Sequence, residues 1–183
     1  MAPSTKQALA ASLKKLLEKK NLDDITVKEL VEDCEVNRQT FYYHFQDIYD
    51  LLHWFLDNET NQALKNSTSW HDSLLRAFYY ARDNQLAVYH VLRSTGRNYL
   101  DVQFYNLARH ITYGVICECS QQLGLAEKDL SFLADFYMYA LAGLMLDWMF
   151  NDMKEEPEAL VGRIVRLLDG EFQRSARKFA PNT

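Results

Sequence analysis

Hydrophobic residues recur along most of the chain with the spacing of amphipathic α-helices. In the first segment Leu9, Leu13, Leu16 and Leu17 fall at i, i+4, i+7 and i+8, while lysines occupy the opposite side. Similar spacing predicts later helices over about 47–64, 70–83, 85–94, 98–123, 129–153 and 157–179. Proline, which breaks helices, is absent from positions 4–156. With two short helices described next, the pattern predicts an all-α protein of about nine helices.

The two short helices follow the first one closely. Thr26 and Glu29 form a Thr-x-x-Glu capping box, which predicts a helix over 27–34. Asn37 is a favourable N-cap for a third helix that starts only a few residues later. Two short helices joined by such a turn are typical of a helix-turn-helix.

The third helix has one apolar side and one polar side. Phe41 and Phe45, at i and i+4, mark the side that faces the core. The free side carries hydrogen-bonding groups: Arg38, Gln39, Thr40, Tyr43 and His44, with Tyr42 near its edge. A helix that enters the major groove of DNA needs such groups. A solvated surface helix is the alternative, but two adjacent exposed tyrosines are unusual for one.

These residues also resemble the DNA-binding domain of TetR-family transcriptional regulators. The resemblance runs from Ile25-Thr26-Val27-Lys28-Glu29-Leu30 through Asn37–Phe45 and is most specific in the Thr-aromatic-Tyr-x-His-Phe run and in Asp50-Leu51-Leu52. It covers about the first 55 residues closely, and the rest only in architecture. It implies a DNA-binding domain over 1–46, a regulatory and dimerisation domain over 47–183, and a further DNA contact from Lys28.

Two positions depart from the family pattern. Glu35 stands in the turn where the family usually has glycine, so the turn either holds Glu35 at positive φ, at a cost of about 1 kcal/mol, or is shaped differently. Ile48 stands where the family usually has a lysine that touches phosphate, and it cannot donate a hydrogen bond. One contact with the DNA backbone is therefore expected to be missing.

Part of the sequence is similar to a subgroup that includes regulators of dihydroxyacetone kinase operons. The similarity lies in Arg38-Gln39-Thr40-Phe41-Tyr42, Phe45-Gln46 and Leu51-Leu52-His53-Trp54. It leaves two alternatives open for the effector, a small molecule or a protein partner. It also leaves open whether the protein activates or represses transcription.

The last two predicted helices, 129–153 and 157–179, are apolar on two faces. One bundle covers only one face of each helix, so the other faces predict a partner chain. TetR-like proteins dimerise through the corresponding helices, and the resemblance therefore implies a homodimer on a palindromic operator. Six residues are expected at the dimer interface: Leu141, Leu144, Trp148, Ile164, Leu168 and Phe172.

Tyrosines are frequent in the C-terminal part, and some could line an effector pocket with apolar walls and a few polar groups. The candidates are Tyr79, Tyr89, Tyr105, Tyr113 and Tyr137. The competing interpretation is that each one belongs to the core or to an interface.

Composition narrows the functional classes. The chain is 48% hydrophobic and 25% charged, as in soluble globular proteins. Residues 1–46 hold seven basic and seven acidic residues, so the net charge of −5 lies in the C-terminal part. Apolar runs are too short for a membrane span and no signal peptide is evident, which predicts a cytoplasmic protein. Three cysteines and scattered histidines predict structural thiols and no metal site.

The sequence thus predicts a DNA-binding transcriptional regulator that is not an enzyme and needs no cofactor. A nucleophile elbow, a P-loop and a dinucleotide fingerprint are all missing from the sequence. An interaction module of the same fold that has lost DNA binding is the first alternative, suggested by Glu35, Ile48 and the neutral charge of the N-terminal part. An α-helical enzyme is the second.

Overall fold

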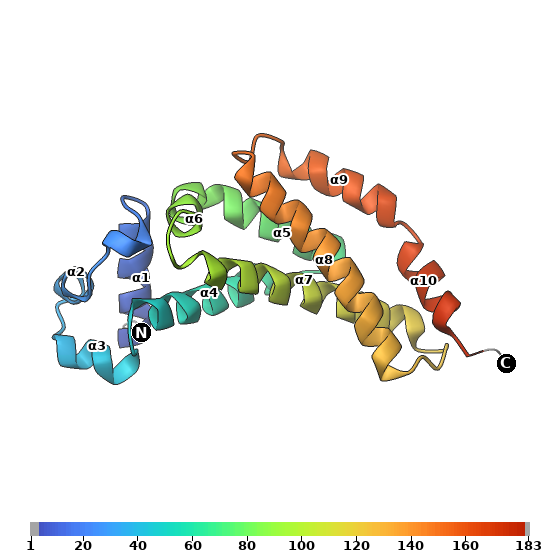
Figure 1. Ribbon diagram of the computed structural model, residues 1–183, viewed down its shortest axis with the longest axis horizontal. Helices are drawn as coiled ribbons and strands as arrows, with labels where there is room; N and C mark the ends of the chain where they lie inside the picture. The colour runs from blue at the N-terminus through green and yellow to red at the C-terminus, as the bar shows by residue number, and fades with distance from the viewer. Residues whose placement is uncertain (1–3, 182–183) are drawn as a thin grey trace. The chain divides into compact units, whose positions relative to one another are not determined.

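The computed structural model describes residues 4–181, and every regular element in this range is a helix, as predicted. Figure 1 shows the helices in chain order. Their bounds are α1 Thr5–Leu17, the 3-10 helix Leu22–Asp24, α2 Val27–Asp33, α3 Arg38–His44, α4 Ile48–Leu64, α5 Trp70–Asp83, α6 Gln85–Leu92, α7 Arg97–Ser120, α8 Glu127–Phe150, α9 Pro157–Leu168 and α10 Glu171–Phe179. By their contacts the helices form two compact units, Met1–Gln62 with Ala81–Gln103, and Ala63–Tyr80 with Phe104–Thr183. The first unit therefore includes more than the DNA-binding domain predicted over 1–46.

The core of the first unit is made by the predicted apolar stripes. Its fully buried side chains include Leu9, Leu13 and Leu17 of α1, Leu30 of α2, Phe41 of α3, and Leu51 and Leu52 of α4. Lys14 of α1 donates to Glu59 of α4 over 2.8 Å, and Gln103 of α7 donates to Asp57 of α4 over 2.6 Å. α3 is thus anchored to the unit through its apolar side, which leaves its polar side free.

The core of the second unit is centred on Phe172 of α10. Its ring lies 5.4 Å from that of Trp70 in α5 and 4.6 Å from that of Tyr137 in α8. Thr112 of α7 is fully buried and donates its hydroxyl to the backbone oxygen of Ala134 in α8 over 2.9 Å. Aromatic packing and a buried hydrogen bond therefore join α5, α7, α8 and α10.

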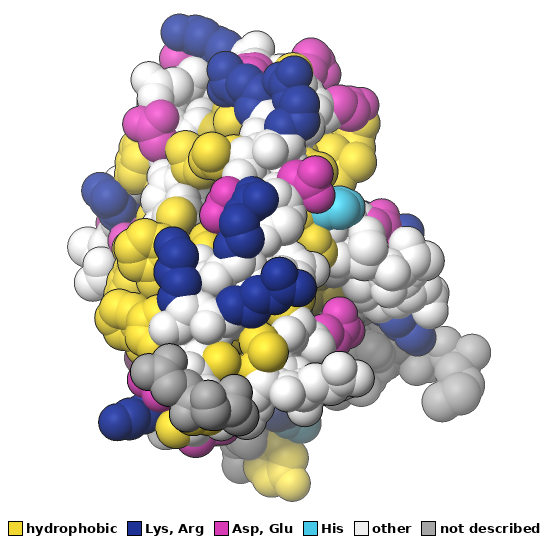
Figure 2. Space-filling model, turned by 90° about the vertical axis from the view of Figure 1, so that its right-hand side faces the viewer, with side chains coloured by type: hydrophobic (Ala, Val, Ile, Leu, Met, Phe, Trp, Pro, Cys, Tyr) yellow, Lys and Arg dark blue, Asp and Glu magenta, His cyan; other side chains and the backbone are white. Residues whose placement is uncertain are grey.

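The last predicted helix is divided in two. The chain breaks between α9 and α10, where Gly170 takes a left-handed conformation with φ 71°. Ten α-helices therefore occur in residues 4–181, one more than expected. The break turns α10 so that Phe172 and Ala176 are buried while Arg174, Arg177 and Lys178 are exposed. Figure 2 shows Lys and Arg side chains on this side of the molecule, with hydrophobic side chains between them.

α8 is the one helix of the described range that is long and apolar enough to cross a membrane by length and composition, contrary to the prediction that the apolar runs are too short. Its most apolar stretch has a mean hydropathy of 1.3. Leu133, Tyr137 and Met145 are nevertheless buried in the second unit, and Asp135 forms an ion pair with Arg109 of α7 at 2.8 Å. These contacts are those of a core helix.

Candidate functional site

The turn between α2 and α3 closes as a Schellman motif. The amide of Val36 donates to the carbonyl of Val31 over 3.0 Å, and the amide of Glu35 donates to the carbonyl of Glu32 over 3.3 Å. Glu35 has φ 54°, the left-handed conformation that glycine adopts most easily. Of the two alternatives for this turn, the chain therefore keeps the positive φ and accepts the strain.

The start of α2 is held by the predicted capping box. Thr26 accepts the amide hydrogen bond of Glu29 over 3.3 Å, and the carboxylate of Glu29 accepts that of Thr26 over 2.9 Å. Lys20 of the segment after α1 also donates to Glu29, over 2.6 Å. The hydrogen bond from Lys20, followed by those from Thr26, lowers the pKa of Glu29 from 4.5 to about 2.

α3 begins at Asn37, also as predicted. The side-chain oxygen of Asn37 accepts hydrogen bonds from the amide of Thr40 over 2.8 Å and from its hydroxyl over 3.1 Å. The hydroxyl of Thr40 is thereby fixed at the first turn of α3, and its oxygen retains lone pairs that can accept a further hydrogen bond.

The structure brings six of the seven predicted DNA-binding residues together on α3. Arg38, Gln39, Tyr42 and Tyr43 are exposed, and Thr40 and His44 are half-buried. Tyr43 is 83% exposed and Tyr42 is 59% exposed, values that are high for aromatic side chains of a folded domain. The seventh, Lys28, lies on α2, where its ammonium group is 3.7 Å from Glu32. The free side of α3 is therefore a row of polar and aromatic groups over the buried ring of Phe41.

The start of α4 carries negative rather than positive charge. The amide of Asp50 donates to Asp47 over 2.9 Å, and the amide of Gln46 donates to Asp50 over 2.9 Å. Ile48 is half-buried and offers no donor. The departure at Ile48 therefore stands, and the two carboxylates next to it do not replace the missing cation.

A polar cluster that the sequence analysis missed joins three segments of the first unit. Asp23, between α1 and α2, accepts hydrogen bonds from the amide of Thr95 over 3.0 Å, from its hydroxyl over 2.7 Å, and from the Tyr49 hydroxyl of α4 over 3.2 Å. The hydroxyl of Thr95 contributes most to lowering the pKa of Asp23. Beside it, a Cβ atom on Gly96 would overlap the side chain of Leu22. The connection between α6 and α7 is therefore packed tightly against the turn after α1.

The five predicted pocket tyrosines have different neighbours. Tyr79 donates to Glu158, Tyr113 donates to Glu127 over 2.8 Å, and the Tyr137 hydroxyl lies 2.8 Å from that of Ser175. The ring of Tyr105 packs against that of Tyr139 at 5.6 Å, whereas Tyr89 belongs to the first unit. The hydrogen bond to Glu127 raises the pKa of Tyr113 to about 12. Four of these tyrosines thus have separate partners in the second unit.

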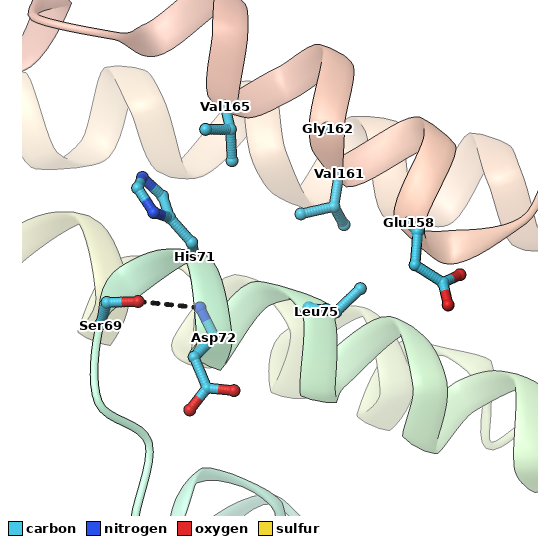
Figure 3. A pocket seen from close by; sticks show the side chains of 8 residues that line it. All are labelled: Ser69, His71, Asp72, Leu75, Glu158, Val161, Gly162 and Val165. Atoms are coloured by element: carbon cyan, nitrogen blue, oxygen red, sulfur yellow. Dashed lines mark hydrogen bonds between the residues drawn. The ribbon is translucent and has the colours of Figure 1, made fainter.

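A groove lies between the start of α5 and α9, with a volume of about 390 Å³. Leu75, Val161 and Val165 provide apolar walls, and Figure 3 shows His71 at one end and Glu158 at the other. Ser69, Asp72 and Gly162 complete the lining. The Asp72 carboxylate points away from the groove in Figure 3. It accepts hydrogen bonds from the amide of Thr68 and from the side chain of Arg76. The groove can hold a small, mainly apolar group.

The predicted dimer interface needs a correction. Leu141, Trp148, Ile164 and Phe172 are each at most 5% exposed, because they pack inside the second unit, and Leu168 is partly buried there as well. Only Leu144, at 41%, is exposed. The outer side of α8 carries other exposed apolar residues at helical spacing: Phe132, Phe136, Tyr139 and Phe150. Leu167 of α9 is exposed too, at 71%.

Comparison with known proteins agrees with this architecture. Residues 8–53 match the family model described as bacterial regulatory proteins of the tetR family, and residues 68–170 match the model of a transcriptional regulator C-terminal region. The chain is 22% identical over 169 residues to the dhaKLM operon transcriptional activator DhaS of Lactococcus lactis, covering 90% of this chain and 88% of that protein.

Solved structures share the same fold. The dihydroxyacetone kinase operon activator DhaS superposes with a TM-score of 0.74 at 20% identity, covering 93% of this chain and 97% of that one. A transcriptional regulator from Pseudomonas aeruginosa PAO1 has a TM-score of 0.59 at 18% identity, and the match covers 95% of this chain and 93% of that one. The TetR-family repressor AlkX from Dietzia has a TM-score of 0.56 at 12% identity, and the match covers 94% of this chain and 97% of that one. The fold is thus found in an activator and in a repressor.

Proposed function

The chain belongs to the TetR family of bacterial transcriptional regulators, and from this premise we propose that it binds a palindromic operator as a homodimer and responds to an effector at its C-terminal domain. Proteins of this family are transcription factors and not enzymes. The observation that carries the proposal is the free side of α3, where Arg38, Gln39, Tyr42 and Tyr43 are exposed on a helix anchored by Phe41. Such a regulator acts on DNA in the cytoplasm.

Within α3 the residues divide by chemistry. Arg38 and Gln39 have planar groups with several donors, which can pair with guanine and with adenine respectively, and they lie in the first turn. Thr40, Tyr42, Tyr43 and His44 have single donors of the kind that contact phosphates. The first pair therefore selects the sequence, and the others position the helix in the groove.

The exposed apolar side of α8 supports the homodimer. Phe132, Phe136, Tyr139 and Phe150 follow one another along this side, and a second copy of the same side would cover them. To read successive major grooves of a palindromic operator, the two α3 helices of such a dimer would have to lie about 34–36 Å apart or somewhat more.

The groove between α5 and α9 supports a small-molecule effector. Its volume of about 390 Å³ lies in the range of small-molecule sites, and its walls are mainly apolar. Gly162 lines the groove, and a Cβ atom there has no neighbour within 4 Å, so leucine fits at this position and would occupy part of the groove. Gly114 of α7 has similarly open space and does not line the groove, so Gly114→Leu is a matched control. We expect Gly162→Leu alone to abolish the response to a small effector. A response that survives in this variant would favour a protein partner instead.

Operator selection from random DNA tests the central proposal. The purified protein should enrich a two-fold symmetric sequence, and that sequence should then bind it in a gel shift. A reporter gene behind the operator would show whether the protein activates or represses transcription. If the purified protein is folded and dimeric but enriches no sequence, the alternative of an interaction module that has lost DNA binding is favoured.

A further inference from the structure

Most of the basic residues in the N-terminal part already have acidic partners. Residues 1–46 contain seven Lys and Arg residues. Four of them form ion pairs, which join Lys14 to Glu59, Lys15 to Asp33, Lys20 to Glu29 and Lys28 to Glu32. Lys6, Lys19 and Arg38 form no ion pair with any described residue of the chain. Only these three cations are free to contact an external anion without first breaking a pair.

Lys6 is held in a defined place by aromatic rings. It lies in the first turn of α1, and its ammonium nitrogen is 5.3 Å from the ring centre of Phe45 and 6.0 Å from that of Trp54. The two rings lie 6.0 Å from each other. Because cation–π attraction fixes the ammonium group but occupies none of its three hydrogen-bond donors fully, those donors remain available.

This place is the C-terminal end of the recognition helix. Phe45 directly follows α3, and its ring also packs 6.0 Å from that of Phe41. Arg38 lies at the opposite end, in the first turn. The seven residues of α3 span about 10 Å, and the major groove is about 12 Å wide, so a helix in the groove comes close to phosphates at both ends.

The end of α3 near Lys6 has no other free cation among these seven. α4 starts there with Ile48, and Asp47 and Asp50 beside it are acidic and exposed. A phosphate approaching this end would meet two carboxylates unless a cation lies close by. Lys6 reaches this position from α1.

We propose that Lys6 is a phosphate-binding residue that supplies, from α1, the positive charge that the start of α4 lacks. This inference rests on the proposed DNA binding of α3. A lysine that neutralises one phosphate releases a counterion, so its loss changes the salt dependence of affinity by a known amount. Because phosphates are identical along DNA, the contribution of Lys6 is the same for any sequence.

The test measures affinity for a duplex of random sequence, with no operator required, at several salt concentrations. Log K falls as log salt rises, and Lys6→Gln should make this slope less steep by about 0.9, whereas Lys6→Arg should keep the wild-type slope. Lys19→Gln is the matched control, since Lys19 also forms no ion pair but lies after α1, away from Phe45; we expect the wild-type slope. Melting temperatures of all variants show whether the fold is intact.

Two outcomes would overturn the inference in distinguishable ways. A wild-type slope in Lys6→Gln would show that Lys6 does not contact phosphate, and a lower melting temperature of the same variant would show that Lys6 only stabilises the packing of Phe45 and Trp54. If the wild-type protein binds no duplex DNA at low salt, the proposed DNA binding is wrong, and so is the phosphate-binding role of Lys6.

Discussion

Replacing Glu35 by glycine should stabilise the protein, although it removes a whole side chain. Glu35 is the left-handed residue of the Schellman motif that ends α2, with φ 54°. An L-residue in this conformation costs about 1–2 kcal/mol, because its Cβ approaches the following carbonyl oxygen. Glycine avoids this cost but loses about 0.5–1 kcal/mol through the greater freedom of its unfolded chain. The net gain is about 0.5–1 kcal/mol.

Glu35→Ala separates this backbone effect from the effect of charge. Both substitutions remove a negative charge at the C-terminus of α2, where the helix dipole disfavours it. Only glycine removes the Cβ. The difference between the two variants therefore measures the strain at this one residue.

The assay is thermal and urea unfolding of wild type, Glu35→Ala and Glu35→Gly at one protein concentration, because the proposed dimerisation would make the melting temperature depend on concentration. Glu35→Gly should melt about 1–4 °C above Glu35→Ala, as expected for a chain of this size. If glycine gives no higher stability than alanine, the positive φ at Glu35 is not strained and the reasoning fails.

Three further predictions concern the DNA-binding domain and the proposed dimer. Arg38→Ala should cost about 1–3 kcal/mol of binding free energy on the selected operator and little on random DNA, whereas Tyr42→Phe should weaken the affinity for both by a similar factor. If Arg38→Ala loses equal affinity for both DNAs, Arg38 contacts phosphate instead of a base. Because the folded pKa of Glu29 is lowered from 4.5 to about 2, its contribution to stability is complete above pH 4.5 and is lost as the pH falls toward 2. In urea unfolding, the difference in unfolding free energy between wild type and Glu29→Gln should therefore shrink over that range, and a constant difference would contradict this. Phe136→Asp should shift the protein toward monomers in light scattering, while Leu86→Asp, at a similarly exposed apolar position of α6, should not; a dimeric Phe136→Asp protein would place the interface elsewhere.

Local signals in the sequence predicted the helix-turn-helix well. Thr26 and Asn37 cap the helices that they were expected to cap, and Phe41 is buried as its spacing indicated. These features depend on residues three or four positions apart, which the sequence displays directly. Gly170 was missed as a helix break, because a glycine within a helix costs only about 1 kcal/mol and packing decides whether the helix continues.

Features that depend on distant residues could not be predicted in the same way. α8 is apolar on nearly every side, so its spacing could not tell that Trp148 faces the core while Phe136 faces outward. The contact of Asp23 with Thr95 joins residues 72 positions apart, and no pattern along the chain marks it. Tertiary packing decides such contacts, and sequence periodicity does not record it.

The ion pairs in the N-terminal part have a consequence for how the protein would search a chromosome. Binding to arbitrary DNA depends almost entirely on cations that neutralise phosphates, and four of the seven candidates here are already neutralised internally. A genome offers about 10⁶–10⁹ competing sites, which sequester a strongly basic regulator. A regulator with few free cations spends less time on these sites, so fewer copies per cell suffice to occupy its operator.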